Sequence, residues 1–363
     1  MTSIAIDASK SRVAARLYEE RAALDDDACR ALLLTCLRWD DPADVARLLG
    51  VADEVRRQHK GDGILLRGIV EFSNQCQNAC HYCGLFRENA DLPRYHLDDE
   101  AIFHAVEMIA GFGIQTVVLQ SGETDDDRPE RVAGWIRRIK AQFPSMAVTL
   151  SLGEKSAGTL ALWRAAGADR YLLKIETTDP ELYAAMHPGM SLSQRMACHQ
   201  TLLSQGYQTG SGGIVGLPGQ SCESLAGDLL YHRRWQFQMT SVSPLIPHPA
   251  TPLADLAPGD LDLTLKVIAL MRLLVPDANS PATTAMGSMQ GVDNRPRALQ
   301  AGANVIMLNF TPPAYKKQYE IYPGKRCLNE AFCAVACIEK MAAGIGRHVD
   351  FAAGHARVGL PAS

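Results

Sequence analysis

The chain has 363 residues, a net charge of −4 and 47% hydrophobic residues, so it can bury a large core in one big α/β domain or two ordinary ones. This charge balance excludes a basic surface for nucleic acid and a polybasic patch for membranes. The N-terminus lacks a cationic leader followed by an apolar core, and no apolar run reaches transmembrane length. We therefore expect a cytoplasmic protein with neither a nucleic-acid nor a membrane partner.

The N-terminal segment is predicted to be helical. Apolar residues recur at helical spacing between residues 12 and 60, and Asp25, Asp26 and Asp27 place negative charge where a helix is expected to start. No residue pattern with a chemical role is visible in this segment. We assign residues 1–58 to an N-terminal helical extension.

From residue 64 onward, short apolar runs alternate with amphipathic segments. The runs predicted as strands are 65–72, 116–119, 147–150, 170–173, 213–216, 240–242, 281–284 and 304–307. Helices are predicted between them, for example at 101–111, 132–142, 156–166 and 263–274. Eight strands alternating with helices favour a (β/α)8 TIM-type barrel over residues 59–310, and no GxGxxG follows the first strand to suggest a Rossmann fold.

Residues 311–363 are expected to form a C-terminal extension that packs on the barrel. Thr311-Pro312-Pro313 breaks the alternating pattern, and the stretch after Gly344 is rich in Gly and Ala. We expect that last stretch to be partly mobile.

Three cysteines directly after the first predicted strand form a CxxxCxxC motif. Cys76, Cys80 and Cys83 lie within eight residues, so one tight loop can turn their sulfurs toward one point. Soft thiolates hold iron–sulfur clusters, and three of them leave one iron of a four-iron cluster open. The alternatives are a zinc knuckle or three reduced core cysteines; zinc is disfavoured because no partner pair of ligands lies within finger distance.

This motif, with Tyr82 before the last cysteine, resembles the signature of the radical S-adenosylmethionine (SAM) enzymes. Longer strings resemble the HydE family, the maturases of FeFe-hydrogenases, over about residues 60–340, and biotin synthase and methylornithine synthase form the wider group. The strings are Glu71–Asn74, Cys83–Leu85, Val118–Glu123, Thr149–Glu154, Ala166–Leu173, Gly216–Gln220, Ile246–Pro249, Pro281–Met286 and Tyr322–Lys325.

The resemblance implies a 4Fe–4S cluster on Cys76, Cys80 and Cys83, and SAM bound to the iron that they leave open. It implies SAM contacts for Gln120, Thr149, Glu176, Arg195, Met239 and Tyr319. The same predicted cofactor set includes Tyr82, Ser121, Gly122, Glu123, Ser151, Gly213 and Ile214, several of which follow predicted strands. Arg195 could bind the methionine carboxylate through two N–H groups, and Glu176 could accept from the ribose hydroxyls or pair with the amine.

Two departures from the HydE pattern concern the second cysteine group and the fourth strand. Cys327, Cys333 and Cys337 are candidates for a second cluster, but their CxxxxxCxxxC spacing differs from the CxxxxxxxCxxC often found in HydE. The chain reads Lys174-Ile175-Glu176 where HydE commonly reads Arg-His-Glu. Lysine keeps the charge but loses the planar guanidinium of arginine, which grips a carboxylate with two hydrogen bonds. This difference weakens the inference that the chain acts on the HydE substrate, an iron-bound cysteine complex.

The predicted reaction is reductive cleavage of SAM to a 5′-deoxyadenosyl radical that acts on a small amino-acid-like or iron-bound cysteine substrate. Candidates for holding that substrate are Lys174, Thr283, Thr284 and Tyr322. The resemblance implies a one-electron donor, such as ferredoxin or flavodoxin, and other hydrogenase maturases as partners. The alternatives are a methylornithine-synthase-like mutase acting on a free amino acid, and a non-catalytic iron–sulfur carrier.

Overall fold

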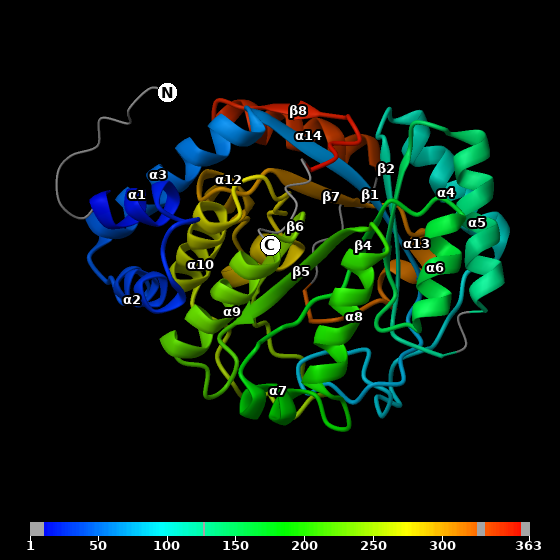
Figure 1. Ribbon diagram of the computed structural model, residues 1–363. Coiled ribbons are helices and arrows are strands. Elements are labelled where there is room, and N and C mark those ends of the chain that lie inside the picture. The colour runs from blue at the N-terminus through cyan, green and yellow to red at the C-terminus, as the bar shows by residue number, and fades with distance from the viewer. Residues whose placement is uncertain (1–10, 126–127, 325–330, 357–363) are drawn as a thin grey trace.

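A curled parallel sheet forms the centre of the molecule (Figure 1). The computed structural model describes residues 11–125, 128–324 and 331–356. Neighbouring strands follow the order β6-β5-β4-β3-β2-β1-β7, so each strand pairs with the next along the chain up to β6. The strands are β1 (Gly63–Ser73), β2 (Thr116–Ser121), β3 (Ala147–Ser151), β4 (Arg170–Leu172), β5 (Gln208–Val215), β6 (Met239–Pro244), β7 (Val305–Asn309) and β8 (His348–Asp350).

The gap between β6 and β7 is bridged by a short segment around residue 280. Asn279 forms a parallel bridge with Met239 of β6, and Pro281 forms one with Val305 of β7. The predicted (β/α)8 barrel is confirmed in this form, but the predicted strand at 281–284 is wrong beyond its first residue. Thr283 is instead the N-cap of α11 (Thr284–Ser288), because the chain turns into a helix as soon as it reaches the edge of the sheet.

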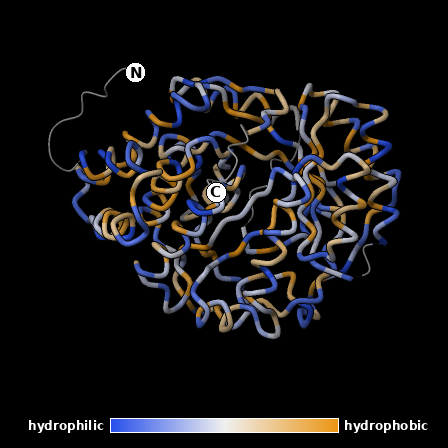
Figure 2. Tube along the Cα trace, in the orientation of Figure 1, coloured by the Kyte–Doolittle hydropathy of each residue, from blue (hydrophilic) through white to orange (hydrophobic). Residues whose placement is uncertain are grey.

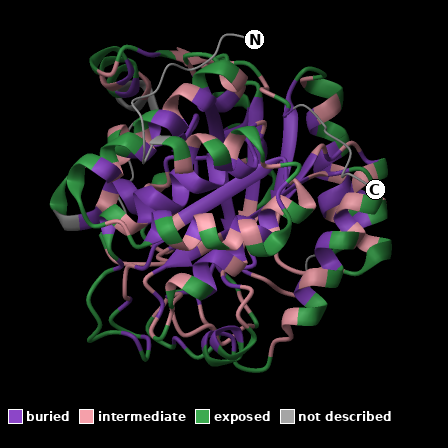
Figure 3. Cartoon of the chain, turned by 60° about the vertical axis from the view of Figure 1, so that its left-hand side comes forward, coloured by how far each residue is buried: buried purple, intermediate pink, exposed green. Residues whose placement is uncertain are grey.

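Helices cover the outside of the sheet, and the buried residues lie along the strands and the inward helix faces (Figure 3). The connecting helices are α4 (Asp99–Gly111), α5 (Pro129–Gln142), α6 (Ala157–Ala165), α7 (Pro180–Met186), α8 (Leu192–Ser204), α9 (Cys222–Trp235), α10 (Leu261–Leu274), η1 (Met289–Gly291) and α12 (Arg295–Gln300). The four helices predicted between strands are confirmed. Hydrophobic and hydrophilic residues alternate along them (Figure 2), as in helices that bury one face.

The N-terminal helices α1 (Ser11–Glu19), α2 (Asp26–Leu37) and α3 (Pro42–Lys60) pack against α9 and α10 on the outside of the barrel. The acidic run acts as expected, because the Asp25 carboxylate caps α2 by accepting from the Ala28 amide at 2.7 Å. The predicted division at residues 58 and 310 remains a prediction. In the structure α3 continues to Lys60 and β7 ends at Asn309.

The C-terminal segment seals the amino-terminal end of the barrel. After α13 (Pro313–Lys316) and α14 (Ala331–Gly344), β8 pairs with the start of β1. The guanidinium of Arg170 donates to the Ala353 carbonyl at 2.6 Å, and the amide of Asn279 donates to the Gly354 carbonyl at 2.7 Å. Buried lumen side chains thus bind the backbone of residues 353 and 354, and the expectation that the stretch after Gly344 is partly mobile stays a prediction.

Parallel pairing brings the carboxyl ends of the strands to one edge. Glu71 of β1 lies opposite Gln120 of β2, which lies opposite Ser151 of β3. The polar residues that follow the strands therefore meet at one mouth of the barrel. Within the described part of the chain, no helix is long and apolar enough to cross a membrane.

Candidate active site

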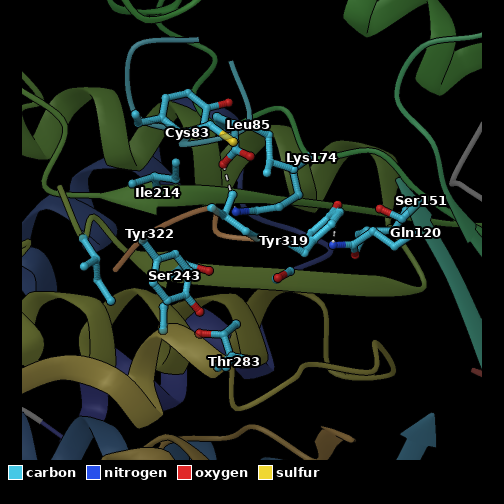
Figure 4. Close-up of a pocket in the computed structure, with 18 of the residues that line it drawn as sticks. Cys83, Leu85, Gln120, Ser151, Lys174, Ile214, Ser243, Thr283, Tyr319 and Tyr322 are labelled. Carbon is cyan, nitrogen blue, oxygen red and sulfur yellow. Dashed lines mark hydrogen bonds and ion pairs between the residues drawn. The ribbon is translucent and has the colours of Figure 1, made fainter. Parts of the chain in front are cut away.

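A cavity of about 340 Å³ opens at the carboxyl ends of the strands. Most of the predicted site residues line it: Cys76, Cys80, Tyr82, Cys83, Gln120, Ser121, Gly122, Ser151, Lys174, Glu176, Ile214, Thr283, Thr284, Tyr319 and Tyr322. Figure 4 shows Cys83, Gln120, Lys174 and Thr283 reaching the cavity from different elements. The topology thus collects side chains that are more than 200 residues apart in the sequence.

The cysteine loop is held by the ends of the neighbouring strands. The Gln77 amide donates to the Glu123 carbonyl at 2.8 Å, and the Gly84 amide donates to the Ile321 carbonyl at 2.9 Å. Gly122 permits this close approach, because a Cβ there would lie 2.1 Å from the Gln75 carbonyl oxygen. The loop is therefore pressed against β2 and the C-terminal extension.

Arg94 is an organising residue that sequence reasoning missed. Its guanidinium donates to the carbonyls of Asn74, Leu85 and Phe86 at 2.7–2.9 Å, on both sides of the cysteines. The side-chain amide of Asn74 in turn donates to the carbonyls of Pro93 and Gln318 at 2.8 Å. No motif marks an arginine that binds only backbone oxygens, so the sequence carries no signal for this role.

The three thiols fit a cluster better than a single metal ion. Among the described residues, no three His, Cys, Asp or Glu side chains converge closely enough to hold one ion. In a cubane each cysteine binds a different iron, so three thiols around one cavity match that arrangement. Burial raises the pKa of all three thiols, that of Cys80 to about 12, so deprotonation here calls for the positive charge of bound iron.

Arg195 forms an ion-pair group beside the cysteine loop, just outside the cavity lining. Its Nε lies 2.7 Å from Glu154 Oε1 and its Nη2 lies 3.5 Å from Glu123 Oε2. Burial lowers the pKa of Arg195, but the two carboxylates outweigh burial and the net shift is upward. Arg195 is thus a fixed cation, and it also donates to the Lys174 carbonyl at 3.4 Å. Glu154 was not among the predicted site residues.

Tyr82 is fixed by a histidine that the sequence did not identify. The His187 Nδ1 hydrogen donates to the Tyr183 carbonyl at 3.0 Å, which leaves Nε2 to accept from the Tyr82 hydroxyl at 2.9 Å. Burial lowers the pKa of His187 to about 4, so the ring is neutral at pH 7. The His187 ring also stacks on Tyr183 with centroids 4.1 Å apart. The Tyr82 ring therefore has a set orientation.

Lys174 and Glu176 form an ion pair at the cavity wall, with Nζ and Oε2 2.9 Å apart. Arg170, at the start of β4, lies at the opposite end of the barrel, where its guanidinium donates to the Ala353 carbonyl. Across the lumen, the Thr283 hydroxyl is buried without a hydrogen-bond partner among the described residues. An anion or hydroxyl bound in the cavity could satisfy it.

Other predicted cofactor residues lie outside the cavity lining. Met239 lies deeper in the barrel, where its sulfur accepts from Arg67 at 3.3 Å, and Thr149 is buried. Gly213 packs on the Glu176 carbonyl, whereas the next residue, Ile214, reaches the cavity. The Gln120 amide donates to the Tyr319 hydroxyl at 3.1 Å and so connects β2 to the C-terminal extension.

The possible second cluster site cannot be assembled from the described residues. Cys327 and the side chain of Cys333 lie outside them, and Cys337 is exposed on α14. That assignment stays a prediction.

Comparison with known proteins gives a consistent set of relatives. Residues 70–229 match the family model described as the radical SAM superfamily. The chain is 44% identical to the [FeFe] hydrogenase maturase subunit HydE of Thermotoga maritima, over 88% of this chain and 91% of that protein. It is 29% identical to the 3-methylornithine synthase of Methanosarcina acetivorans, over 78% and 79% of the two chains.

Solved structures agree on the fold. The crystal structure of methylornithine synthase (PylB) superposes with a TM-score of 0.76 at 24% identity, covering 93% of this chain and 97% of that one. The structure of HydG, a maturase of the [FeFe]-hydrogenase, gives a TM-score of 0.78 at 18% identity, covering 95% and 77%. These similarities concern the barrel and its extensions.

Proposed function

Because this chain belongs to the radical SAM superfamily, we propose that it uses its cavity to expose one small substrate to a 5′-deoxyadenosyl radical, as a maturase of FeFe-hydrogenases. The observation that carries this proposal is the 44% identity to HydE over nearly the whole of both chains. Membership in the superfamily alone indicates the radical chemistry but does not identify the substrate.

The enzyme uses a 4Fe–4S cluster and SAM, as its superfamily does. The chemistry that the cluster supplies when bound is one-electron reduction of the sulfonium, which breaks the C5′–S bond to leave methionine and the radical. Cys76, Cys80 and Cys83 would hold the cluster. Arg195 would bind the carboxylate of the methionine moiety, and Glu176 would accept hydrogen bonds from the ribose hydroxyls.

The chain's own residues orient the substrate and exclude water. We propose that Lys174 and the Thr283 hydroxyl hold an anionic group of the substrate, since one is a cation and the other lacks a hydrogen-bond partner among the described residues. Thr284 and Tyr322 complete this group at the cavity wall. The apolar side chains of Leu85, Ile214 and Ile321 also face the cavity, where they would keep solvent from the radical.

Complementation tests the proposed role in hydrogenase maturation. The chain is expressed in a host that has an FeFe-hydrogenase and lacks its own HydE, and hydrogen evolution is measured. We expect wild-type chain to restore evolution and the Cys80→Ala variant to fail. Normal SAM cleavage by wild-type protein without restored hydrogen evolution would contradict the maturase assignment.

A second candidate function is a mutase related to methylornithine synthase. The observation that favours it is Lys174-Ile175 in place of the Arg-His common in HydE, because this change weakens the inference that the chain takes the HydE substrate. Reduced protein with SAM and free amino acids should then form 3-methylornithine or an isomer, with deuterium passing through 5′-deoxyadenosine. A carrier or scaffold without catalytic activity would bind the cluster and form no 5′-deoxyadenosine.

The partners and location follow from the same proposal. A one-electron donor such as ferredoxin or flavodoxin would reduce the cluster, and other hydrogenase maturases would supply or receive the iron-bound substrate. Every described cysteine is free, which fits the reducing cytoplasm. A second cluster at Cys327, Cys333 and Cys337 would be an addition to this activity.

A further inference from the structure

The backbone that carries Lys174 and Glu176 contains an extra residue relative to its neighbour β5. Leu172 pairs with Gly210 and Glu176 pairs with Gly213. Between these pairs the chain advances four residues after β4 but only three along β5. We call this segment, Leu173–Glu176, the strand-4 bulge; such bulges change the direction of side chains at the ends of barrel strands.

Glu176 ends the bulge in the left-handed conformation, with φ of 64°. This region is unfavourable for a residue with a Cβ atom, so neighbouring contacts must maintain it. The backbone of Glu176 bonds to β5 in both directions: its amide donates to Gly212 at 3.0 Å, and its carbonyl accepts from Ile214 at 3.2 Å. These bonds fix one side of the bulge.

The other side is held by Asp228, a buried carboxylate on α9. Its Oδ1 accepts from the Thr178 amide at 2.5 Å, from the Thr178 hydroxyl at 2.7 Å and from the Thr177 hydroxyl at 3.4 Å. Asp228 does not line the cavity. One oxygen atom therefore fixes the two residues that follow Glu176.

His199 and Ser211 hold the beginning of the bulge from the same helix-facing side. The Nε2 hydrogen of His199 donates to the Leu173 carbonyl at 2.5 Å, and its Nδ1 accepts from the Tyr231 hydroxyl at 3.0 Å. The Ile175 amide donates to the Ser211 hydroxyl oxygen at 3.3 Å. We call His199, Ser211 and Asp228 the rear clamp; none of the three lines the cavity.

We propose that Asp228 is a positioning residue for the reaction: through Thr177 and Thr178 it holds the strand-4 bulge so that the carboxylate of Glu176 and the ammonium of Lys174 face the cavity. The inference rests on the proposed function, in which Glu176 binds the ribose of SAM. Without Asp228, the Thr178 amide loses its acceptor, and the left-handed Glu176 two residues earlier can relax. The Glu176 carboxylate would then face the nucleotide for only part of the time.

The test compares Asp228→Leu, which fills the space without an acceptor, with Asp228→Asn, which keeps one. Reconstituted, reduced protein is assayed for 5′-deoxyadenosine over a range of SAM concentrations. We expect Asp228→Leu to raise the KM for SAM about tenfold, the size of one lost hydrogen bond, and Asp228→Asn, which keeps an acceptor oxygen, to stay within about twofold of wild type. Asp44→Leu, at a buried carboxylate on α3, is the matched control; it should lower the Tm and leave the KM unchanged.

Two further variants keep the proposal falsifiable. If Asp228→Leu does not fold, Ser211→Ala removes the acceptor of the Ile175 amide from the same bulge and should also raise the KM. Glu176→Gln reports on the proposed function separately, since it changes the carboxylate without changing the clamp. A raised KM in Glu176→Gln with an unchanged KM in Asp228→Leu and Ser211→Ala would overturn the positioning role alone. Unchanged values in all three would overturn the role of Glu176 and this proposal together.

Discussion

The ion pair of Lys174 with Glu176 brings two opposite charges to the cavity wall, and each is proposed to meet a different ligand. Glu176 is assigned to the nucleotide and Lys174 to the substrate. A substitution at Lys174 should therefore affect the substrate more than SAM.

Lys174→Ala should raise the KM for the substrate about tenfold or more, because a charge-assisted hydrogen bond to an anion is lost. Cleavage of SAM without substrate should stay within about threefold of wild type, since the cysteines and Arg195 are untouched. The measurement is 5′-deoxyadenosine formation with and without substrate. Lys140→Ala is the control, because Lys140 also pairs with a carboxylate, Asp169, but lies outside the cavity lining. Equal effects of the two variants would contradict the assignment of Lys174.

Asp228 also predicts a pH dependence of stability. Burial raises its pKa from 3.8 to about 7, so between these values the folded protein binds more protons than the unfolded chain. The contribution of Asp228 to the free energy of unfolding therefore falls as pH rises from about 4 to about 7, by up to roughly 4 kcal/mol. His187, His199 and His232 act in the opposite direction, since burial lowers their pKa values to about 4.

Comparing wild type with Asp228→Asn isolates the contribution of the Asp228 carboxyl group to the free energy of unfolding, because the variant keeps the histidines and an acceptor oxygen. Urea unfolding at several pH values should show wild type losing stability relative to the variant as pH rises through this range. A difference that does not change with pH would mean that the carboxyl group is ionised in both states.

At the scale of elements, the junction of β2 with the cysteine loop depends on a missing side chain. A Cβ at Gly122 would lie 2.1 Å from the Gln75 carbonyl oxygen and 2.8 Å from the Cys76 Cβ. The backbone at Gln75 and the side chain of Cys76 would both have to move to make room for it.

Gly122→Ala should therefore lower the iron content after reconstitution to less than about half that of wild type, since changes in residues that position metal ligands commonly cost tenfold or more in metal affinity. Gly134→Ala on α5 is the matched control, because nothing lies within 4 Å of its added Cβ and alanine favours the helix. Iron and sulfide analysis gives the readout. Full iron content in Gly122→Ala would show that the loop can move away from β2 without losing its ligands.

The elements differed in how well the sequence predicted them. The stretch 65–72 predicted β1 because a barrel strand buried on both faces is rich in apolar residues, which here are interrupted by Arg67, Gly68 and Glu71. Thr283 and Thr284 have strand-forming side chains, yet they start a short helix, since local propensity carries no information about where the sheet ends. The strand-4 bulge was missed because a glutamate in the left-handed region leaves no mark in composition.

At the scale of the whole molecule, the barrel is closed at one end and has its cavity at the other. The last described residues seal the amino-terminal end through Arg170. The cysteine loop, Tyr319, Ile321 and Tyr322 border the cavity at the opposite end. The motifs identified which residues gather at the open end, because strand ends of parallel barrels meet there. They could not identify Arg94, His187 or Asp228, whose partners become neighbours only in the folded chain.

The most direct test of the central claim measures metal content and SAM cleavage together in anaerobically reconstituted wild type and Cys80→Ala. We expect wild type to hold about four irons and four sulfides per chain and to form 5′-deoxyadenosine when reduced. Cys80→Ala should lose that cleavage while remaining folded. Zinc bound at the cysteine loop of wild type, or cleavage that persists in Cys80→Ala, would contradict the account.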